Sequence, residues 1–158
     1  MTRAQAISLV GGLLAGLLLA GAALHVTGLG AAPAAGAGVP PARVAMMIAP
    51  NIHRGPDGKL HDAFTPTDLR ARAGQHLIVT VYNYDMGPHS VMAPALHLNV
   101  TIPPAPRVGV AAVRVFALTV QKAGVYAWHC MKPCDDAAHG WAMSHPGFMA
   151  GTITITPA

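Results

Sequence analysis

Both cysteines of this chain lie in one short segment that also carries histidine and methionine. Residues 124–149 hold the two cysteines, three of the nine histidines and three of the eight methionines. The candidate ligands in this segment are Cys130, Cys134, His139, Met143, His145 and Met149. Thiolate, imidazole and thioether together are the donors that suit copper held for electron transfer. The segment therefore predicts a copper site.

Two other interpretations use the same residues. In an oxidising compartment two cysteines most often form a disulfide, so Cys130 and Cys134 could be bonded to each other. Such a short loop would gain little stability from loop entropy. Two sulfurs and two imidazoles in a tetrahedral arrangement fit zinc, and His139 and His145 would complete that set. Both alternatives stay open at the level of the sequence.

The elements that must position these residues are predicted to be strands. Residues 76–84, 109–120 and 152–156 alternate apolar with other side chains, which is the period of a half-buried strand. Glycine and proline are frequent, and no stretch of the domain keeps a helical period for three turns. Seven or eight short strands in about 115 residues predict an all-β, Greek-key sandwich.

The N-terminal part differs from the rest in composition. After Arg3, residues 4–24 carry no charge. A positive start before an apolar run is typical of an export signal, and a run of about 20 residues can also span a bilayer as a helix. We expect a signal peptide or helical membrane anchor at 1–30, an Ala/Gly/Pro linker at 31–42 and one domain at 43–158. The domain would lie on the extracytoplasmic side of the cell membrane, or be secreted if the signal is cleaved.

Charge and motifs exclude several classes of function. The net charge of +4 is spread along the chain without a basic cluster, so nucleic-acid binding is not expected. All six acidic residues are Asp, and there is neither a Gly-x-Ser-x-Gly elbow nor a His-Glu-x-x-His motif. Hydrolysis is therefore not expected, and any activity should belong to the metal.

Residues 43–158 resemble the cupredoxin family. Cys130 closes the penultimate strand four residues after Tyr126, as in blue-copper proteins. His145-Pro-Gly-Phe-Met149, which precedes the final strand, is similar to the azurin-type end. The resemblance implies the cupredoxin sandwich and a copper ion held at one end of it.

A second set of residues resembles the soluble domain of cytochrome c oxidase subunit II. His89-Ser90, followed by Pro94-x-Leu96, is similar to its His-Ser…Pro-x-Leu segment, and Cys130-x3-Cys134 has the spacing of its dinuclear CuA centre. There the carbonyl of Lys132 would take the place of the family's backbone ligand. The loop departs from that pattern, because ten residues separate Cys134 from His145, and four separate it from His139.

The resemblance implies one ligand set with an alternative register. The preferred set is His89, Cys130, Cys134, His145 and Met149; the alternative register uses His139 and Met143 in place of the last two. Rigid elements on both sides favour the first. The copper would be mononuclear type 1 or dinuclear CuA. Candidates for the hydrogen-bond partner of a ligating imidazole are Asn83, Asp85 and Ser90.

The expected function is that of a membrane-anchored copper protein carrying single electrons in a respiratory chain, with a cytochrome or oxidase as partner, and not that of an independent enzyme. The first alternative is the CuA-type electron-entry subunit of a terminal oxidase. The second is a copper-binding or storage module without a redox role.

The remaining soft and titratable side chains have simpler expected roles. The histidines without a motif, most of which we expect at the surface, are His25, His53, His61 and His76. By strand alternation His129 points away from Cys130. We expect the other methionines to fill gaps in the core, and the alternative is a Met-rich face that acquires copper. These methionines are Met46, Met47, Met86 and Met92.

Overall fold

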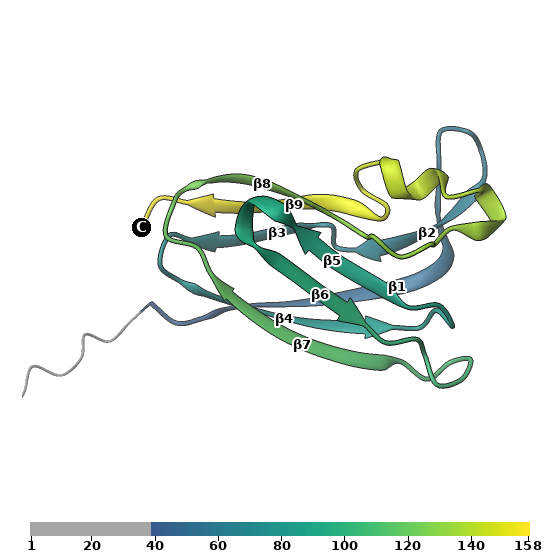
Figure 1. Ribbon diagram of the computed structural model, residues 1–158, viewed down its shortest axis with the longest axis horizontal. Coiled ribbons are helices and arrows are strands. Elements are labelled where there is room, and N and C mark those ends of the chain that lie inside the picture. Colours follow the sequence, from purple (N-terminus) through teal and green to yellow (C-terminus); the bar gives the residue numbers. More distant parts are fainter. Residues whose placement is uncertain (1–38) are drawn as a thin grey trace, which may run out of the picture. The chain divides into compact units, whose positions relative to one another are not determined.

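The computed structural model describes residues 39–158, which form nine strands and three short 3-10 helices (Figure 1). The expected signal or anchor at 1–30, and the linker up to residue 38, lie outside the described residues. The strands are β1 Ala42–Arg54, β2 Leu60–Thr65, β3 Asp68–Arg72, β4 His76–Asn83, β5 His89–Ala93, β6 Leu98–Ile102, β7 Ala112–Thr119, β8 Gly124–His129 and β9 Ala150–Thr156. The 3-10 helices are η1 Pro94–Leu96, η2 Asp136–Ala138 and η3 Trp141–Ser144.

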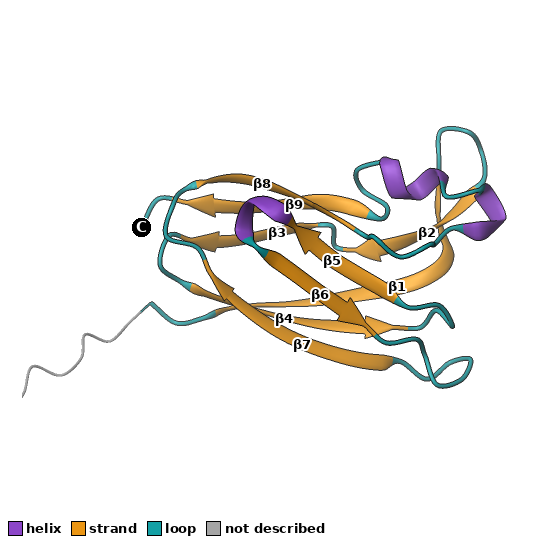
Figure 2. Ribbon diagram, viewed as in Figure 1, coloured by secondary structure: helices purple, strands orange, loops and turns teal. Residues whose placement is uncertain are grey.

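The strands form two sheets, and the predicted all-β sandwich is confirmed (Figure 2). One sheet has the order β2-β1-β4-β7 and the other β3-β9-β8-β5-β6. Both are mixed, because β1 runs parallel to β4 and β3 runs parallel to β9 while the other pairs are antiparallel. Within residues 39–158 no helix is both long and apolar enough to cross a membrane.

The core follows from the alternation of side chains along the strands. The buried apolar residues of β4 are Leu77, Val79 and Val81, and those of β9 include Ile153 and Ile155. Because successive side chains of a strand point to opposite faces, each strand contributes one row to the space between the sheets. The core that these rows fill continues to the cysteines at one end of the sandwich.

The structure corrects the prediction that the other methionines fill the core. Met46 is fully buried in the core, but Met47 and Met86 are exposed and Met92 is half-buried. Met46 and Met47 are neighbours in β1, so one of them must face solvent. The interpretation as core filler therefore holds for Met46 and is wrong for Met47 and Met86.

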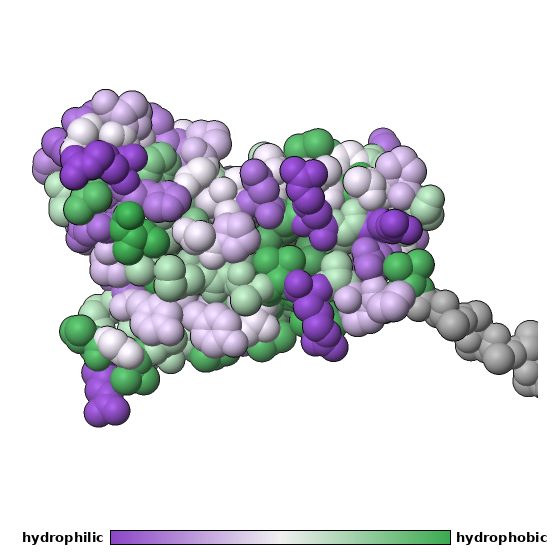
Figure 3. Space-filling model, turned by 180° about the vertical axis from the view of Figure 1, so that it is seen from behind, coloured by the Kyte–Doolittle hydropathy of each residue, from purple (hydrophilic) through white to green (hydrophobic). Residues whose placement is uncertain are grey.

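The surface is unevenly polar. Seen from behind, apolar and pale residues cover much of the middle, while hydrophilic residues gather at the upper left (Figure 3). Isolated apolar side chains on a protein surface are normal.

Candidate metal centre

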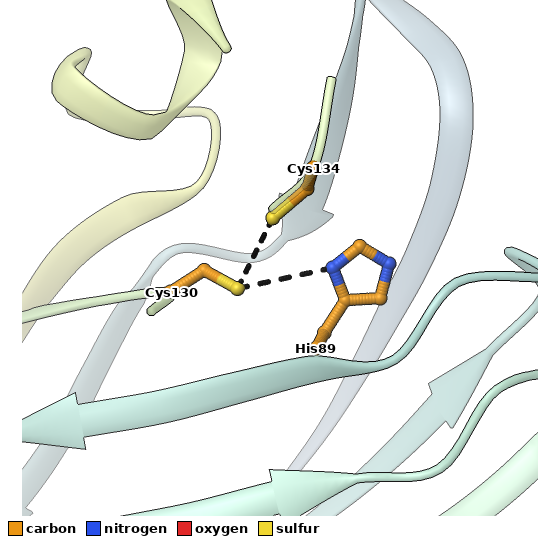
Figure 4. Close-up of side chains that lie close together, drawn as sticks. All are labelled: His89, Cys130 and Cys134. Atoms are coloured by element: carbon orange, nitrogen blue, oxygen red, sulfur yellow. Dashed lines mark hydrogen bonds between the residues drawn. The ribbon is translucent and has the colours of Figure 1, made fainter. Parts of the chain in front are cut away.

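Three predicted ligands meet inside the protein at one end of the sandwich. The ligand atoms of His89, Cys130 and Cys134 lie within 4.8 Å of one another, and all three residues are buried. The two sulfurs are 3.2 Å apart, and His89 Nδ1 lies 3.9 Å from Cys130 Sγ. The three side chains point toward a common centre (Figure 4). Both thiols are free, because bonded sulfurs would be only about 2.0 Å apart.

Neighbouring strands bring these residues together. His89 is the first residue of β5, and Cys130 directly follows β8. The two strands pair through Met92 and His129, so the beginning of β5 lies beside the end of β8. Cys130 N–H donates to Met149 O at 2.8 Å, which also fixes this segment to the beginning of β9. The position of Cys130 is therefore set by the sheet on both sides.

The two thiols differ strongly in acidity. The pKa of Cys130 is lowered to about 4, chiefly by the hydrogen bond from Cys134, while burial opposes the shift and the hydrogen bond to His89 supports it. The same contact raises the pKa of Cys134, and burial raises it further. Ser90 N–H also donates to Cys130 Sγ at 3.3 Å. Cys130 is thus a thiolate near neutral pH, which is the form that binds metals.

A backbone carbonyl adds an oxygen to the group. Lys132 O lies 2.8 Å from Cys134 Sγ and 3.7 Å from Cys130 Sγ. The resemblance to subunit II assigned the backbone ligand to this residue. The carbonyl lies beside both sulfurs because Lys132 is midway between the cysteines in the sequence.

Asp85 orients His89 from outside the group. Its Oδ2 accepts a hydrogen bond from His89 Nε2 at 2.8 Å, which leaves Nδ1 to face the sulfurs. Burial lowers the pKa of His89, but Cys130 and Asp85 outweigh it, so the net shift is upward. Asn83 Oδ1 in turn accepts from the backbone N–H of Asp85 at 2.9 Å. This is the outer support that a metal-binding imidazole requires.

The other predicted ligands lie at different places. Met149 is fully buried, and its backbone bonds to Cys130. His145 lies outside the group of three: its Nδ1 donates to Trp141 O at 2.6 Å and its ring stacks on Trp141 at 3.5 Å. His139 is exposed and Met143 half-buried. The assignments of His145 and Met149, and of the alternative register, stay predictions.

A second buried polar cluster was not foreseen from the sequence. His61, expected at the surface, is fully buried in β2, so that prediction is wrong. Its Nδ1 lies 2.9 Å from Asp135 Oδ2 and its Nε2 lies 3.0 Å from Asp57 Oδ1. Asp135 also accepts from Ala142 N–H at 2.8 Å, while its own N–H donates to Asp62 Oδ2 at 2.9 Å. Because Asp135 directly follows Cys134, this cluster fixes the loop that carries the second thiol.

The charge state of His61 follows from its two partners. Burial lowers the pKa of His61, but hydrogen bonds to Asp57 and Asp135 outweigh it and raise the pKa. An imidazole with a carboxylate at each nitrogen can donate to both only when doubly protonated. The ring stacks on Trp141 with the centroids 4.2 Å apart, and Trp141 stacks on His145. His61, Trp141 and His145 thus form a continuous stack under the loop.

An acidic pocket leads to the sulfurs. A cavity of about 230 Å³ reaches Cys134 and is lined by Asp62, Asp85, Asp135 and Asp136 among others. Carboxylates around a cavity attract cations.

The donor set fits copper. The thiolate and the second thiol are soft donors and the imidazole is an intermediate one, and the carbonyl oxygen is the single hard donor beside them; such a set is favoured by copper and less suited to hard cations. The four-ligand zinc alternative is not assembled in this conformation, since His139 and His145 both lie outside the group of three.

The fold is similar to that of several solved protein structures. No protein-family profile matches the chain, and no curated protein matches it in sequence. Among solved structures, the blue copper oxidase of Nitrosomonas europaea matches with a TM-score of 0.52 and 16% identity, over 73% of this chain and 38% of that one. The copper nitrite reductase of the same organism matches with a TM-score of 0.50 and 20% identity, over 73% of this chain and 41% of that one. The copper-containing nitrite reductase of Thermus scotoductus matches with a TM-score of 0.51 and 20% identity, over 73% of this chain and 27% of that one.

These matches define the class of fold. The described domain is a cupredoxin-fold β-sandwich, as the sequence resemblance implied, and the solved structures named here are copper proteins that share the fold. The chain spans less than half the length of each of those solved chains. The candidate metal centre of this chain is the group of two cysteines and His89 at one end of the sandwich.

Proposed function

We propose that this protein binds copper through His89, Cys130 and Cys134 and carries single electrons. The observation that carries the proposal is the buried group of two sulfurs, 3.2 Å apart, beside an imidazole nitrogen in a cupredoxin fold. Bound copper would supply reversible one-electron chemistry. The protein would keep its ligands nearly fixed in both oxidation states, so that little has to reorganise during electron transfer.

The chain's own residues divide this task. Cys130 offers a thiolate that Ser90 N–H holds in place. Asp85 holds the proton on His89 Nε2, so that Nδ1 presents its lone pair to the metal. Burial of all three side chains keeps water away from the ligands. The acidic pocket beside Cys134 gives a cation a favourable route inward.

One observation favours a dinuclear site over a mononuclear one. Lys132 O lies beside both sulfurs, and Cys134 lies close enough to Cys130 for both to bridge two ions. This arrangement supports the second candidate function, a CuA-type electron-entry subunit of a terminal oxidase. A mononuclear site would use Cys130 and leave Cys134 as a neighbour.

Copper loading distinguishes these cases. We expect purified protein to bind copper and to develop an intense visible absorption band that disappears on reduction. A dinuclear site should give two copper ions per chain and a hyperfine pattern from two equivalent nuclei. Replacing Cys130 by Ser should abolish the band in either case, whereas Cys134→Ser should abolish only the dinuclear spectrum. A colourless protein, or colour that survives Cys130→Ser, would refute the proposal.

The two registers of the loop need a separate test. In the preferred register His145 is a ligand, and the hydrogen bond from its Nδ1 to the Trp141 carbonyl would leave Nε2 as the ligand atom. We expect His145→Ala to change the copper spectrum and His139→Ala to leave it unchanged. The opposite result would favour the alternative register with Met143.

We further propose that the protein works at the extracytoplasmic side of a membrane with a cytochrome or oxidase as partner. The apolar, uncharged stretch 4–24 after Arg3 supports this. Separating membranes from soluble fractions of cells expressing the full chain would test the anchor. Electron transfer from a reduced cytochrome to the copper-loaded protein would test the redox role and exclude the alternative of simple storage.

A further inference from the structure

The outer face of the five-stranded sheet carries a group of soft side chains next to the buried cysteines. Along β8 and beyond it, Trp128 and Cys130 are buried, whereas His129 is half-exposed and Met131 is 55% exposed. His129 and Met131 therefore lie on the opposite face of the strand from Cys130. His129 Nε2 lies 3.1 Å from Met131 Sδ.

The strand register adds a second thioether to this face. Met92 of β5 is the antiparallel partner of His129, and side chains of such partners share a face with Cβ atoms about 5 Å apart. Met131 N–H donates to Ser90 Oγ at 2.8 Å, which fixes Met131 beside the residue two positions before Met92. Met92 and Met131 thus lie diagonally across the two strands, with His129 within reach of both thioethers.

Packing does not account for this group. The residues that flank His129 on the same face, Ala127 along β8 and Ala150 across on β9, are too small to cover its ring. Met131 is more than half exposed, so its thioether contributes little to the core. Met131 is open to solvent and Met92 and His129 are partly so, at the same end of the sandwich as the buried thiols.

The chemistry of the group is selective for a soft cation. Thioether and imidazole together are ligands for monovalent copper and have little affinity for hard cations. Nitrogen and sulfur ligands bind a metal ion at about 2.0 and 2.3 Å, which puts two such ligand atoms about 3 to 4 Å apart. The observed distance of 3.1 Å from His129 Nε2 to Met131 Sδ lies in that range.

We propose that Met92, His129 and Met131 form a second, solvent-facing site for a soft monovalent cation, namely Cu(I). This site is separate from the buried centre, because Cys130 points to the other side of the same segment. It does not depend on the proposed electron-transfer function. With exposed ligands and no thiolate it should bind more weakly than the buried group.

The test removes the buried thiols and observes the methionines directly. The full chain with Cys130→Ser and Cys134→Ser is labelled at its methionine ε-methyl carbons and titrated with Ag(I), a redox-inert substitute for Cu(I). We expect the ε-methyl resonances of Met92 and Met131 to shift and to saturate at one ion per chain. Met86, which is exposed outside the group, should not shift. No saturable shift, or an equal shift of Met86, would overturn the proposal.

Substitutions then measure the contribution of each ligand. In the same Cys-free background, Met131→Leu keeps the volume of the side chain and should weaken Cu(I) binding at least tenfold in competition with a chromophoric Cu(I) chelator. His129→Ala with Met131→Leu should remove the site. The matched control combines Met86→Leu and His97→Asn, which change an exposed thioether and an exposed imidazole elsewhere. Equal affinities in the control and the Met131→Leu variant would refute the assignment. Because the buried thiols are absent throughout, this result is independent of the proposed function.

Discussion

His89 shows how a candidate ligand depends on a partner outside the group of three. Asp85 holds Nε2 at 2.8 Å and thereby aims Nδ1 at the sulfurs. We expect Asp85→Asn, an isosteric change that removes the charge, to lower copper affinity about 10- to 100-fold. Chelator competition would measure it, with Asp136→Asn as the control, since Asp136 lines the same pocket but makes no contact with His89. Equal affinities of the two variants would show that Asp85 has no such role.

The raised pKa of His61 predicts that the stability of the protein depends on pH. Its pKa is raised in the folded protein above the ordinary 6.5. The stabilisation from its two carboxylate contacts is therefore complete below that ordinary value and is lost as the pH rises through the raised pKa. The pKa of Asp57 is lowered by its hydrogen bond to His61, so the contribution of this carboxylate is lost only in acid, as the pH falls through that lowered pKa.

The measurement compares unfolding midpoints of the metal-free protein and its His61→Gln variant from about pH 5 to about pH 9, the span over which histidines titrate. The wild-type midpoint should be higher by several degrees at the acid end, and the difference should shrink toward the alkaline end. His97→Asn, which changes an exposed histidine, should give a constant difference. A difference that grows with pH would contradict the assigned charge of His61.

At this scale the sequence predicted that His89 lies with the two cysteines and that Asp85 is a candidate partner of the imidazole, but it did not predict the cluster around His61. His89, Cys130 and Cys134 could be identified because motif and spacing persist in the sequence. The contact of His61 with Asp135 joins residues 74 positions apart, and nothing local to His61 signals a buried role. The position of Asp135, directly after a candidate ligand, was the available signal. The stacking of His145 on Trp141 was equally hidden, because only the folded loop brings the two rings together.

Among the elements, the junction of β3, β8 and β9 is the most tightly packed point near the site. Thr67 O accepts hydrogen bonds from Trp128 Nε1 at 2.9 Å and from Thr152 N–H at 3.2 Å. A Cβ on Gly151 would lie 2.1 Å from this oxygen, so only glycine fits. The absence of a side chain at Gly151 allows Thr67 O to accept hydrogen bonds from both β9 and the Trp128 indole of β8.

Gly151→Ala should therefore destabilise the domain. The added carbon meets backbone rather than a flexible side chain, and such overpacking costs about 1–3 kcal/mol or more. Chemical denaturation of the metal-free protein would measure the loss. Gly58→Ala is a useful comparison, because a Cβ there meets no neighbouring atom, although its positive φ of 79° adds a local strain. A Gly151→Ala variant that is no less stable than Gly58→Ala would contradict the packing argument.

The sequence predicted the strands but not how they pair. Alternation identified β4 and β9 as half-buried strands, since the period of apolar residues is a local property. It did not reveal that β1 runs parallel to β4, or that β3 runs parallel to β9. Pairing depends on contacts between distant segments. The assignment of Met47 to the core failed for a local reason, because both faces of β1 contain apolar residues.

For the whole domain, the candidate centre is positioned by the fold. The three candidate ligands lie within 4.8 Å of one another, and the supporting hydrogen bonds come from the strands and their turns. We expect the metal-free protein to show the same β-rich circular dichroism as the loaded one. Copper should raise the free energy of unfolding by mass action, by about 2.7 kcal/mol when free copper is at about a hundred times the dissociation constant, and the unfolding midpoint should rise with it. Loss of the β signal on metal removal would show that the metal is needed for folding.

The place of β9 within its sheet constrains how the protein can be made. β9 lies between β3 and β8, although it follows both of them in the chain. A ribosome or export channel delivers the segments in order, so β3 and β8 must wait, unpaired with each other, until residues 150–156 emerge and fill the gap. Both thiols therefore leave the channel before their supporting strand is in place, and during that interval the nascent chain presents them to any oxidant or metal that it meets.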